Sequence, residues 1–195
     1  FEIVLVDNSK DDDYSRFLEG NGFKVIRAPY FDLARDRIIY SRNLLRKYLL
    51  ENDFDYFLSL EADVIAPSDI IWRLLAHKKD IVSGVYFNNL EKDGRIQTLM
   101  TLWVNRGDDK ETIYHVSEVE LQRPRLINIA MCGLGCVLIS RRVLEKIEFR
   151  YDKNFVSFDD VWFCKDAKDN GFQLFLESDI QVKHLHKPWT EKEYN

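Results

Sequence analysis

The chain has 195 residues, of which 46% are hydrophobic and 31% charged, and its formal net charge is −5 at pH 7. This length and balance predict one folded domain, 1–195, and exclude a disordered chain. The negative charge argues against a nucleic-acid partner, and no apolar run approaches the roughly 20 residues that cross a bilayer. We therefore expect no membrane span and a cytoplasmic protein.

The first half of the chain alternates between predicted strands and predicted helices. Apolar, β-branched runs bounded by turn residues indicate the strands, and apolar residues at helical spacing indicate the helices. The predicted strands are 1–6, 23–26, 56–60 and 80–87, and the predicted helices are 9–20, 33–50 and 68–76. This alternation is typical of right-handed parallel β-α-β units.

The second half of the chain has a different pattern. Residues 88–125 are polar and irregular, which predicts a loop-rich region with short antiparallel strands. After it, the sequence predicts an apolar segment at 126–140, helices at 141–147 and 159–170, and strands at 172–176 and 180–185. Together the two halves predict an α/β fold, in which a central, mostly parallel sheet has helices on both faces and a small antiparallel region follows in the second half.

The three cysteines are Cys132, Cys136 and Cys164. An odd number does not make a complete disulfide framework, and the first two are too widely spaced for the common zinc knuckle. We therefore expect buried free thiols, and a disulfide stays open as an alternative if the source is a hyperthermophile.

Two carboxylates, Glu61 and Asp63, directly follow the predicted strand 56–60, and Asp7 follows the first predicted strand. Ligands of open parallel sheets bind beyond such carboxyl ends, so we expect these residues at one edge of one sheet. Glu61 and Asp63 point to the same side of an extended segment and repel each other unless a cation lies between them. Their oxygens suit Mg²⁺ or Mn²⁺. The plain alternative is a solvated acidic turn before Pro67.

The order of these features along the chain resembles that of the GT-A-fold glycosyltransferases, and in particular the broad family-2-like group. The matching segments are I-V-L-V-D at 3–7, Arg42–Asn43, Glu61–Ala62–Asp63, Gly133–Leu134–Gly135, Asp159–Asp160 and His184. The sequence departs from the family at Glu61 and Asp159, where the family usually has Asp and Glu. The family also usually has a further strand ahead of the one predicted at 1–6.

The resemblance implies a GT-A-like, nucleotide-diphospho-sugar transferase fold and a metal-dependent glycosyltransferase. Such an enzyme moves a sugar from a nucleotide-diphosphate donor to a hydroxyl acceptor on a glycan or a protein, with inversion, and uses Mn²⁺ or Mg²⁺. It would divide the chain into a nucleotide-binding half, 1–87, and an acceptor and catalytic half, 88–195. The implied roles are metal binding for Asp63, Glu61 and His184, nucleotide binding for Asp7, Arg42, Asn43 and Glu61, and catalysis for Asp160 as general base, with Asp159 orienting the acceptor.

Several of these residues have a simpler structural explanation. Asp7 begins an Asp-Asn-Ser turn, and Ser157 with Asp160 fits a capping box at the start of a helix. His184 and His186 face one side of the same predicted strand, and the family pattern favours His184 as the ligand. Sugar rings could stack on the aromatic side chains of Tyr86, Trp103, Trp162 and Trp189, although aromatic residues are more often part of the core.

Two other functions stay open. A non-catalytic protein of the same fold could bind a nucleotide sugar without turnover, because a fold does not determine a function. A nucleotidyltransferase is the second alternative, but it needs a glycine-rich, basic phosphate loop, and residues 7–11 are acidic instead. A Rossmann dehydrogenase is disfavoured because Gly133–Leu134–Gly135 precedes a strand and lacks the third glycine.

Overall fold

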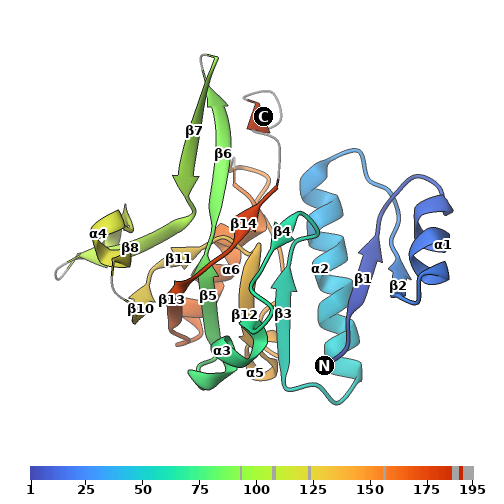
Figure 1. Cartoon of the computed structure of the whole chain (residues 1–195), viewed down its shortest axis with the longest axis horizontal. Coiled ribbons are helices and arrows are strands. Elements are labelled where there is room, and N and C mark those ends of the chain that lie inside the picture. The colour runs from blue at the N-terminus through green and yellow to red at the C-terminus, as the bar shows by residue number, and fades with distance from the viewer. Residues whose placement is uncertain (93, 107–108, 123, 156, 186–188, 191–195) are drawn as a thin grey trace.

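The computed structural model of the chain describes residues 1–92, 94–106, 109–122, 124–155, 157–185 and 189–190 (Figure 1). In this part of the chain, the central sheet has five strands in the order β10-β13-β5-β12-β3. Its strands are β3 (Tyr56–Leu60), β5 (Ile81–Val85), β10 (Leu126–Ile129), β12 (Cys136–Ser140) and β13 (Leu174–Gln181).

The central sheet is mixed, which corrects the prediction of a mostly parallel sheet. β12 lies between β5 and β3 and runs antiparallel to both, whereas β13 runs parallel to β5. β5 and β12 are buried along their whole length, as their continuous apolar runs indicate. An apolar run shows that a strand is buried but does not show its direction or its neighbours. The insertion of β12 was therefore not visible in the sequence.

The first two strands form the predicted β-α-β unit, but they lie outside the central sheet. β1 (Val4–Asp7) and β2 (Lys24–Arg27) pair in parallel as a separate two-stranded sheet, connected by α1 (Asp13–Gly20). The long helix α2 (Ala34–Glu51) contacts both β1 and β3 and lies beside them in Figure 1. The expectation that Asp7 shares a sheet with Glu61 and Asp63 is therefore wrong, because a helix separates the two sheets.

The helices cover both faces of the central sheet, as predicted. They are α2, α3 (Ile70–Ala76), α5 (Arg141–Leu144) and α6 (Asp159–Asp169), whereas the short helix α4 (Glu118–Leu121) belongs to the region 88–125. One buried cluster contains apolar residues of α2, α5 and α6, and the other contains those of α3. Neighbouring residues of β5 point into different clusters, Ile81 into the first and Val82 into the second. The three cysteines lie in these clusters as buried free thiols, which confirms the prediction.

The region 88–125 is more regular than the sequence predicts. Its short antiparallel strands are present, but they form two hairpins, and the first of these, β6–β7, projects from the body of the molecule (Figure 1). The strands outside the central sheet in this part of the fold are β6 (Phe87–Lys92), β7 (Arg95–Met100), β8 (Leu102–Arg106), β9 (Asp109–His115) and β11 (Met131–Cys132). Polar residues dominate β6 and β9, and the apolar run at 99–104 is divided between β7 and β8, so the sequence did not show where each strand begins and ends. None of the described helices combines the length and the apolar character that crossing a membrane requires.

The acidic segment after β3 and the glycine-bearing segment before β12 lie at the same edge of the central sheet. β3 and β5 end at this edge, and β12 begins there, because β12 runs antiparallel to both. The short strands β4 (Val64–Ile65) and β14 (Lys183–His184) pair beside it, and β15 (Trp189–Thr190) pairs with β6. We refer to this edge as the site edge.

Candidate active site

The three predicted metal ligands converge at the site edge. Glu61 follows β3 directly, Asp63 precedes β4, and His184 lies in β14, which pairs with β4. One oxygen or nitrogen atom from each of these side chains lies within 4.8 Å of the other two. Carboxylate oxygens with an imidazole nitrogen are a donor set that accepts Mn²⁺, whereas Mg²⁺ prefers oxygen alone. The structure thus brings together side chains that lie 121 residues apart in the sequence.

Each ring nitrogen of His184 lies close to an oxygen that accepts hydrogen bonds. Its Nδ1 lies 3.1 Å from the carbonyl oxygen of Phe87, which can only accept, so Nδ1 carries a proton. Its Nε2 lies 3.2 Å from Oδ2 of Asp63, and in a ring whose one proton is on Nδ1 the two lone pairs at that distance repel each other. A second proton on the ring or a shared cation removes the repulsion. Metal-bound histidines usually have this arrangement, with the other ring nitrogen donating to a carbonyl, so these residues fit a metal ion.

Tyr86 holds one oxygen of Glu61 and was not assigned this role from the sequence. Its hydroxyl donates to Oε2 of Glu61 at 2.7 Å and lies 3.3 Å from Nε2 of His184. The side chain is buried, and this burial together with the Glu61 charge raises the pKa of Tyr86 well above its ordinary value. Tyr86 is therefore a hydrogen-bond donor within the site and not a platform for a sugar ring. Its place directly after β5, at the same edge as Glu61, was the available signal.

The glycine-bearing segment 133–135 leaves room for the contact between Tyr86 and Glu61. A Cβ atom on Gly135 would lie 2.5 Å from two ring atoms of Tyr86 and 2.9 Å from Oε2 of Glu61. The backbone carbonyl of Gly135 also accepts a hydrogen bond of 3.1 Å from the backbone N–H of Glu61. Glycine is thus required here by close packing against the carboxylate and its donor.

Arg42 joins the two acidic segments of the sequence. Its Nη1 donates to both carboxylate oxygens of Asp159 at 2.6 Å, and its Nη2 donates to Oε1 of Glu61 at 2.9 Å. The side chain of Arg42 is 11% exposed and that of Asp159 only 2%. Burial alone would lower the pKa of Arg42, but the two carboxylates raise it. Because protein groups engage both side chains, the geometry does not favour the expected contacts of Arg42 with a nucleotide and of Asp159 with an acceptor.

Asp160 lies in the first turn of α6, next to this pair. Burial and the Asp159 charge raise the pKa of Asp160 to about 6, although the backbone N–H of Val161 donates to it at 2.8 Å. The predicted capping box is absent, because Phe158 occupies the N-cap position of α6. The hydroxyl of Ser157 instead accepts a hydrogen bond of 3.0 Å from the indole of Trp162. Asp160 is therefore a partly buried acid that does not cap the helix.

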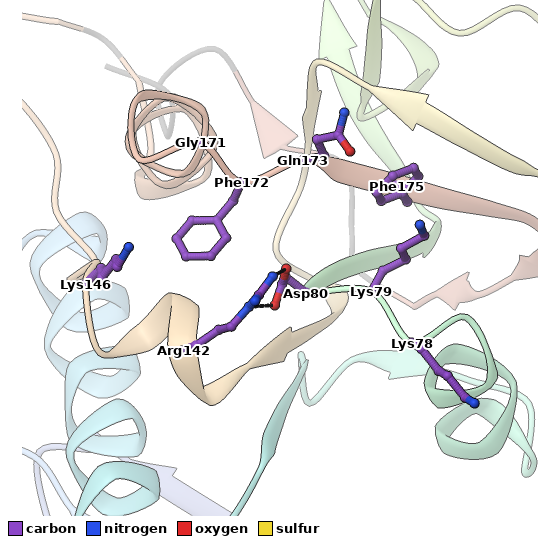
Figure 2. A pocket seen from close by; sticks show the side chains of 9 residues that line it. All are labelled: Lys78, Lys79, Asp80, Arg142, Lys146, Gly171, Phe172, Gln173 and Phe175. Atoms are coloured by element: carbon purple, nitrogen blue, oxygen red, sulfur yellow. Dashed lines mark hydrogen bonds and ion pairs between the residues drawn. The ribbon is translucent and has the colours of Figure 1, made fainter.

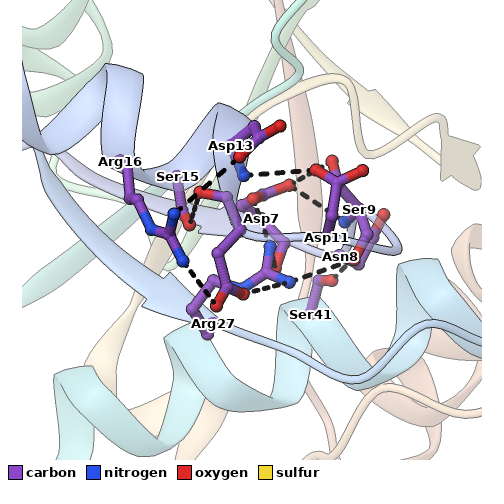
Figure 3. A network of polar contacts seen from close by, with 10 residues as sticks. Asp7, Asn8, Ser9, Asp11, Asp13, Ser15, Arg16, Arg27 and Ser41 are labelled. Carbon is purple, nitrogen blue, oxygen red and sulfur yellow. Dashed lines mark hydrogen bonds and ion pairs between the residues drawn. The ribbon is translucent and has the colours of Figure 1, made fainter.

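Asp7 lies in a polar network of its own, shown in Figure 3. Its Oδ1 accepts hydrogen bonds from the backbone N–H of Ser9 at 3.0 Å and from the Ser9 hydroxyl at 2.6 Å, and its Oδ2 pairs with Arg27. Burial raises the pKa of Asp7, but the hydrogen bonds of Ser9 and the charge of Arg27 outweigh it and hold the pKa below its ordinary value. The turn explanation weighed from the sequence thus accounts for both contacts of Oδ1, and the ion pair with Arg27 of β2 occupies Oδ2.

Asn43 also has a structural role. Its side-chain N–H₂ donates to the carbonyl of Phe149 at 2.8 Å, and its side-chain oxygen accepts from the N–H of Phe149 at 3.0 Å. The amide therefore bridges α2 to the chain after α5, so the geometry does not favour its assignment to nucleotide binding. Of the remaining candidates, Trp103 packs against His115, with ring centroids 5.1 Å apart. His186 and the side chain of Trp189 lie outside the described residues.

Comparisons with known proteins identify the fold. No protein-family model and no curated protein sequence matches the chain. Among solved structures, A197 from STIV matches with a TM-score of 0.54 and 18% sequence identity, over 94% of this chain and 84% of that one. GalNAc-T7, crystallised with UDP, GalNAc and Mn²⁺, matches with a TM-score of 0.61 and 14% identity, over 99% of this chain and 40% of that one. The chain thus spans about two-fifths of GalNAc-T7.

These likenesses show a GT-A-like glycosyltransferase fold, as the order of the sequence motifs predicts. The run of the sequence as a whole also resembles a small viral glycosyltransferase-like protein, and the match to A197 confirms that likeness at the level of the fold. At 14–18% identity the likeness extends to the fold alone.

Proposed function

We propose that the chain is a metal-dependent glycosyltransferase that moves a sugar from a nucleotide-diphosphate donor to a hydroxyl acceptor on a glycan or a protein. The observation that carries the proposal is the convergence of Glu61, Asp63 and His184 at the site edge of a GT-A-like sheet. The UDP, GalNAc and Mn²⁺ in the structure of GalNAc-T7 support the proposed ligand class.

Asp63 and His184 are the proposed direct ligands of Mn²⁺ or Mg²⁺, through Oδ2 and Nε2. Glu61 has one oxygen held by Arg42 and the other by Tyr86, so we assign it to a contact through water or to the ribose of the donor. When bound, the ion neutralises the negative charge that develops on the departing diphosphate.

Asp160 is the proposed general base. A carboxylate with a pKa of about 6 is ionised at pH 7, and it is a stronger base than an ordinary aspartate. It accepts the proton of the acceptor hydroxyl as that oxygen attacks the sugar, a role that favours inversion. Asp159 keeps its two hydrogen bonds to Arg42 and so positions α6 against Glu61, without touching the acceptor.

A non-catalytic nucleotide-sugar-binding protein is the second candidate. The observation that favours it is that Asp7 and Arg42, which the family resemblance assigns to the nucleotide, are both engaged by protein groups. A protein of this kind would bind the donor with metal but release no nucleotide diphosphate.

The first experiment is a thermal unfolding series with UDP and Mn²⁺, each alone and together. A ligand at 100 times its Kd stabilises the folded state by about 2.7 kcal/mol, or roughly 5–10 °C in Tm for a chain of this size. We expect this shift only with both ligands, and we expect it to vanish in Asp63→Ala. Asp53→Ala, which changes an exposed loop residue, should keep the shift.

A sugar-nucleotide hydrolysis screen separates the two candidate functions. Release of nucleotide diphosphate that depends on Mn²⁺ supports the enzyme, and Asp160→Asn should abolish it while keeping the thermal shift. A shift without any release supports the binding protein. If UDP and the other nucleotide diphosphates give no shift with Mn²⁺, both candidates are wrong.

A further inference from the structure

A cleft lies at the edge of the central sheet opposite the site edge (Figure 2). Its volume is about 450 Å³, and its walls come from the loop before β5, the helix α5 with the turn after it, and the turn before β13. β5 begins at this edge with Ile81 and ends at the site edge with Val85, four residues later, which is roughly 13 Å along the strand. A small ligand in this cleft therefore does not reach the proposed metal ligands.

Basic side chains surround the cleft. They are Lys78, Lys79, Arg142 and Lys146. The carboxylate in the lining, Asp80, pairs with Arg142 and accepts a hydrogen bond of 2.7 Å from the Ser140 hydroxyl. In the part of the chain that the structure describes, no carboxylate oxygen lies within 4.0 Å of any of the three lysine ammonium groups. Asp80 neutralises the arginine, so the three lysines leave a local positive charge in a chain whose net charge is −5.

Two of these lysines are held at the cleft by aromatic rings, as Figure 2 shows. The ammonium of Lys79 lies 4.8 Å from the ring centroid of Phe175, and that of Lys146 lies 5.4 Å from the ring centroid of Phe172. Cation–π contacts of this kind hold a charged group in place without neutralising it. The two charges therefore stay available to a ligand between the two rings.

We propose that this cleft binds a small phosphorylated anion of about the size of a diphosphate, at a site separate from the proposed sugar transfer. A concave site lined by unneutralised cations attracts an anion and concentrates it. Ammonium groups bind phosphate as point charges and donate hydrogen bonds to its oxygens. The concave shape suits a small ligand better than an extended surface such as a membrane. The Asp80–Arg142 pair forms one wall and fixes it in place.

Isothermal titration with inorganic pyrophosphate in the presence of EDTA tests the proposal. The chelator removes divalent ions, so the proposed donor site does not contribute to the signal. We expect binding at low ionic strength and a loss of affinity of about tenfold or more in Lys79→Ala/Lys146→Ala, because two charged hydrogen-bond donors are removed. The matched control is Lys47→Ala/Lys153→Ala, which removes the same charge from exposed positions outside the cleft. It should stay within about twofold of the parent affinity.

The outcomes separate this proposal from the proposed function. Asp63→Ala should bind pyrophosphate under these conditions as well as the parent chain does, even if it loses every response to UDP with Mn²⁺. The proposal is overturned if pyrophosphate does not bind. It is also overturned if both double variants lose affinity equally, which would indicate general charge attraction, or if vesicles of anionic lipid bind where pyrophosphate does not.

Discussion

At Asp160, burial and the neighbouring Asp159 charge both oppose ionisation, and they raise the pKa from an ordinary 3.8 to about 6. Between these two pH values the folded chain holds a proton that the unfolded chain has lost. The stability of the fold therefore falls as the pH rises through this window, and the whole penalty is present above pH 6. The difference between the two pKa values corresponds to about 3 kcal/mol as an upper limit.

We predict that Asp160→Asn stabilises the protein at pH 8, by up to about 3 kcal/mol, because the amide keeps the side-chain oxygen but carries no charge. The gain should shrink as the pH falls and disappear near pH 4. Urea unfolding in the presence of EDTA, repeated across this range, measures it.

Asp53→Asn is the control for Asp160→Asn, because Asp53 is exposed and should give no pH-dependent difference. A gain in stability that stays constant from pH 4 to pH 8 would contradict the raised pKa of Asp160. The proposed base role adds a second test at the same residue. The transfer rate of the parent chain should rise with pH through about 6, as the carboxylate ionises.

At the scale of single residues, the sequence indicated which carboxylates are candidates for the site but not which residues hydrogen-bond to them. Glu61 and Asp63 could be selected because they follow a buried strand, and the structure places His184 beside them. The partners of Glu61 could not be selected in this way. Arg42 and Tyr86 reach its two oxygens from a helix and from a neighbouring part of the sheet, and such contacts depend on the arrangement of the elements in space.

Among the elements, the position of β12 determines which residues meet at the site edge. Its first residue follows Gly135, and its insertion between β5 and β3 brings that glycine against the ring of Tyr86 and the carboxylate of Glu61. The alternation of strands and helices was enough to predict the fold class and most of the elements. It was not enough to predict a mixed strand order, because the antiparallel strand comes from the second half of the chain.

We predict that Gly135→Ala destabilises the fold by about 1–3 kcal/mol, because its Cβ atom has to displace the buried ring of Tyr86 and a carboxylate oxygen of Glu61. The same displacement moves Glu61, so Mn²⁺ affinity measured by EPR should fall as well. Urea unfolding measures the first effect.

Gly20→Ala is the matched control for Gly135→Ala. Gly20 ends α1, and a Cβ atom added there meets nothing within 4 Å. We expect this variant to be unchanged or more stable by up to about 1 kcal/mol, because alanine restricts the unfolded chain. Equal stability of Gly135→Ala and the parent chain would show that Tyr86 has room to move, and the packing account of this glycine would then be wrong.

Across the whole molecule, Arg42 connects parts of the chain that are far apart in sequence. It lies in α2, it binds Glu61 at the end of β3, and it binds Asp159 at the start of α6. β12, from the second half, is itself paired with strands of the first half. The expected nucleotide-binding half, 1–87, and acceptor half, 88–195, are thus interleaved in the described structure. We infer that they unfold as one unit.

We predict that Arg42→Met costs about 3–5 kcal/mol of unfolding free energy, because it leaves the nearly inaccessible carboxylate of Asp159 without its cation. The double variant Arg42→Met/Asp159→Asn should be more stable than Arg42→Met alone, because the amide carries no charge to desolvate. Urea unfolding followed by far-UV circular dichroism and by tryptophan fluorescence measures both variants. The two probes should give one transition.

The control for this cycle is Arg73→Met, which breaks an ion pair of 2.9 Å between Arg73 and the more exposed Asp179. Exposed pairs contribute little, so we expect a change of less than about 1 kcal/mol. The single variant Asp159→Asn completes the cycle. If the changes in unfolding free energy of the two single variants add up to that of the double variant, Arg42 and Asp159 have no coupling energy. If instead the two probes give separate unfolding transitions in the parent chain, the halves 1–87 and 88–195 fold independently. Arg42 would then connect two units that are each stable without it.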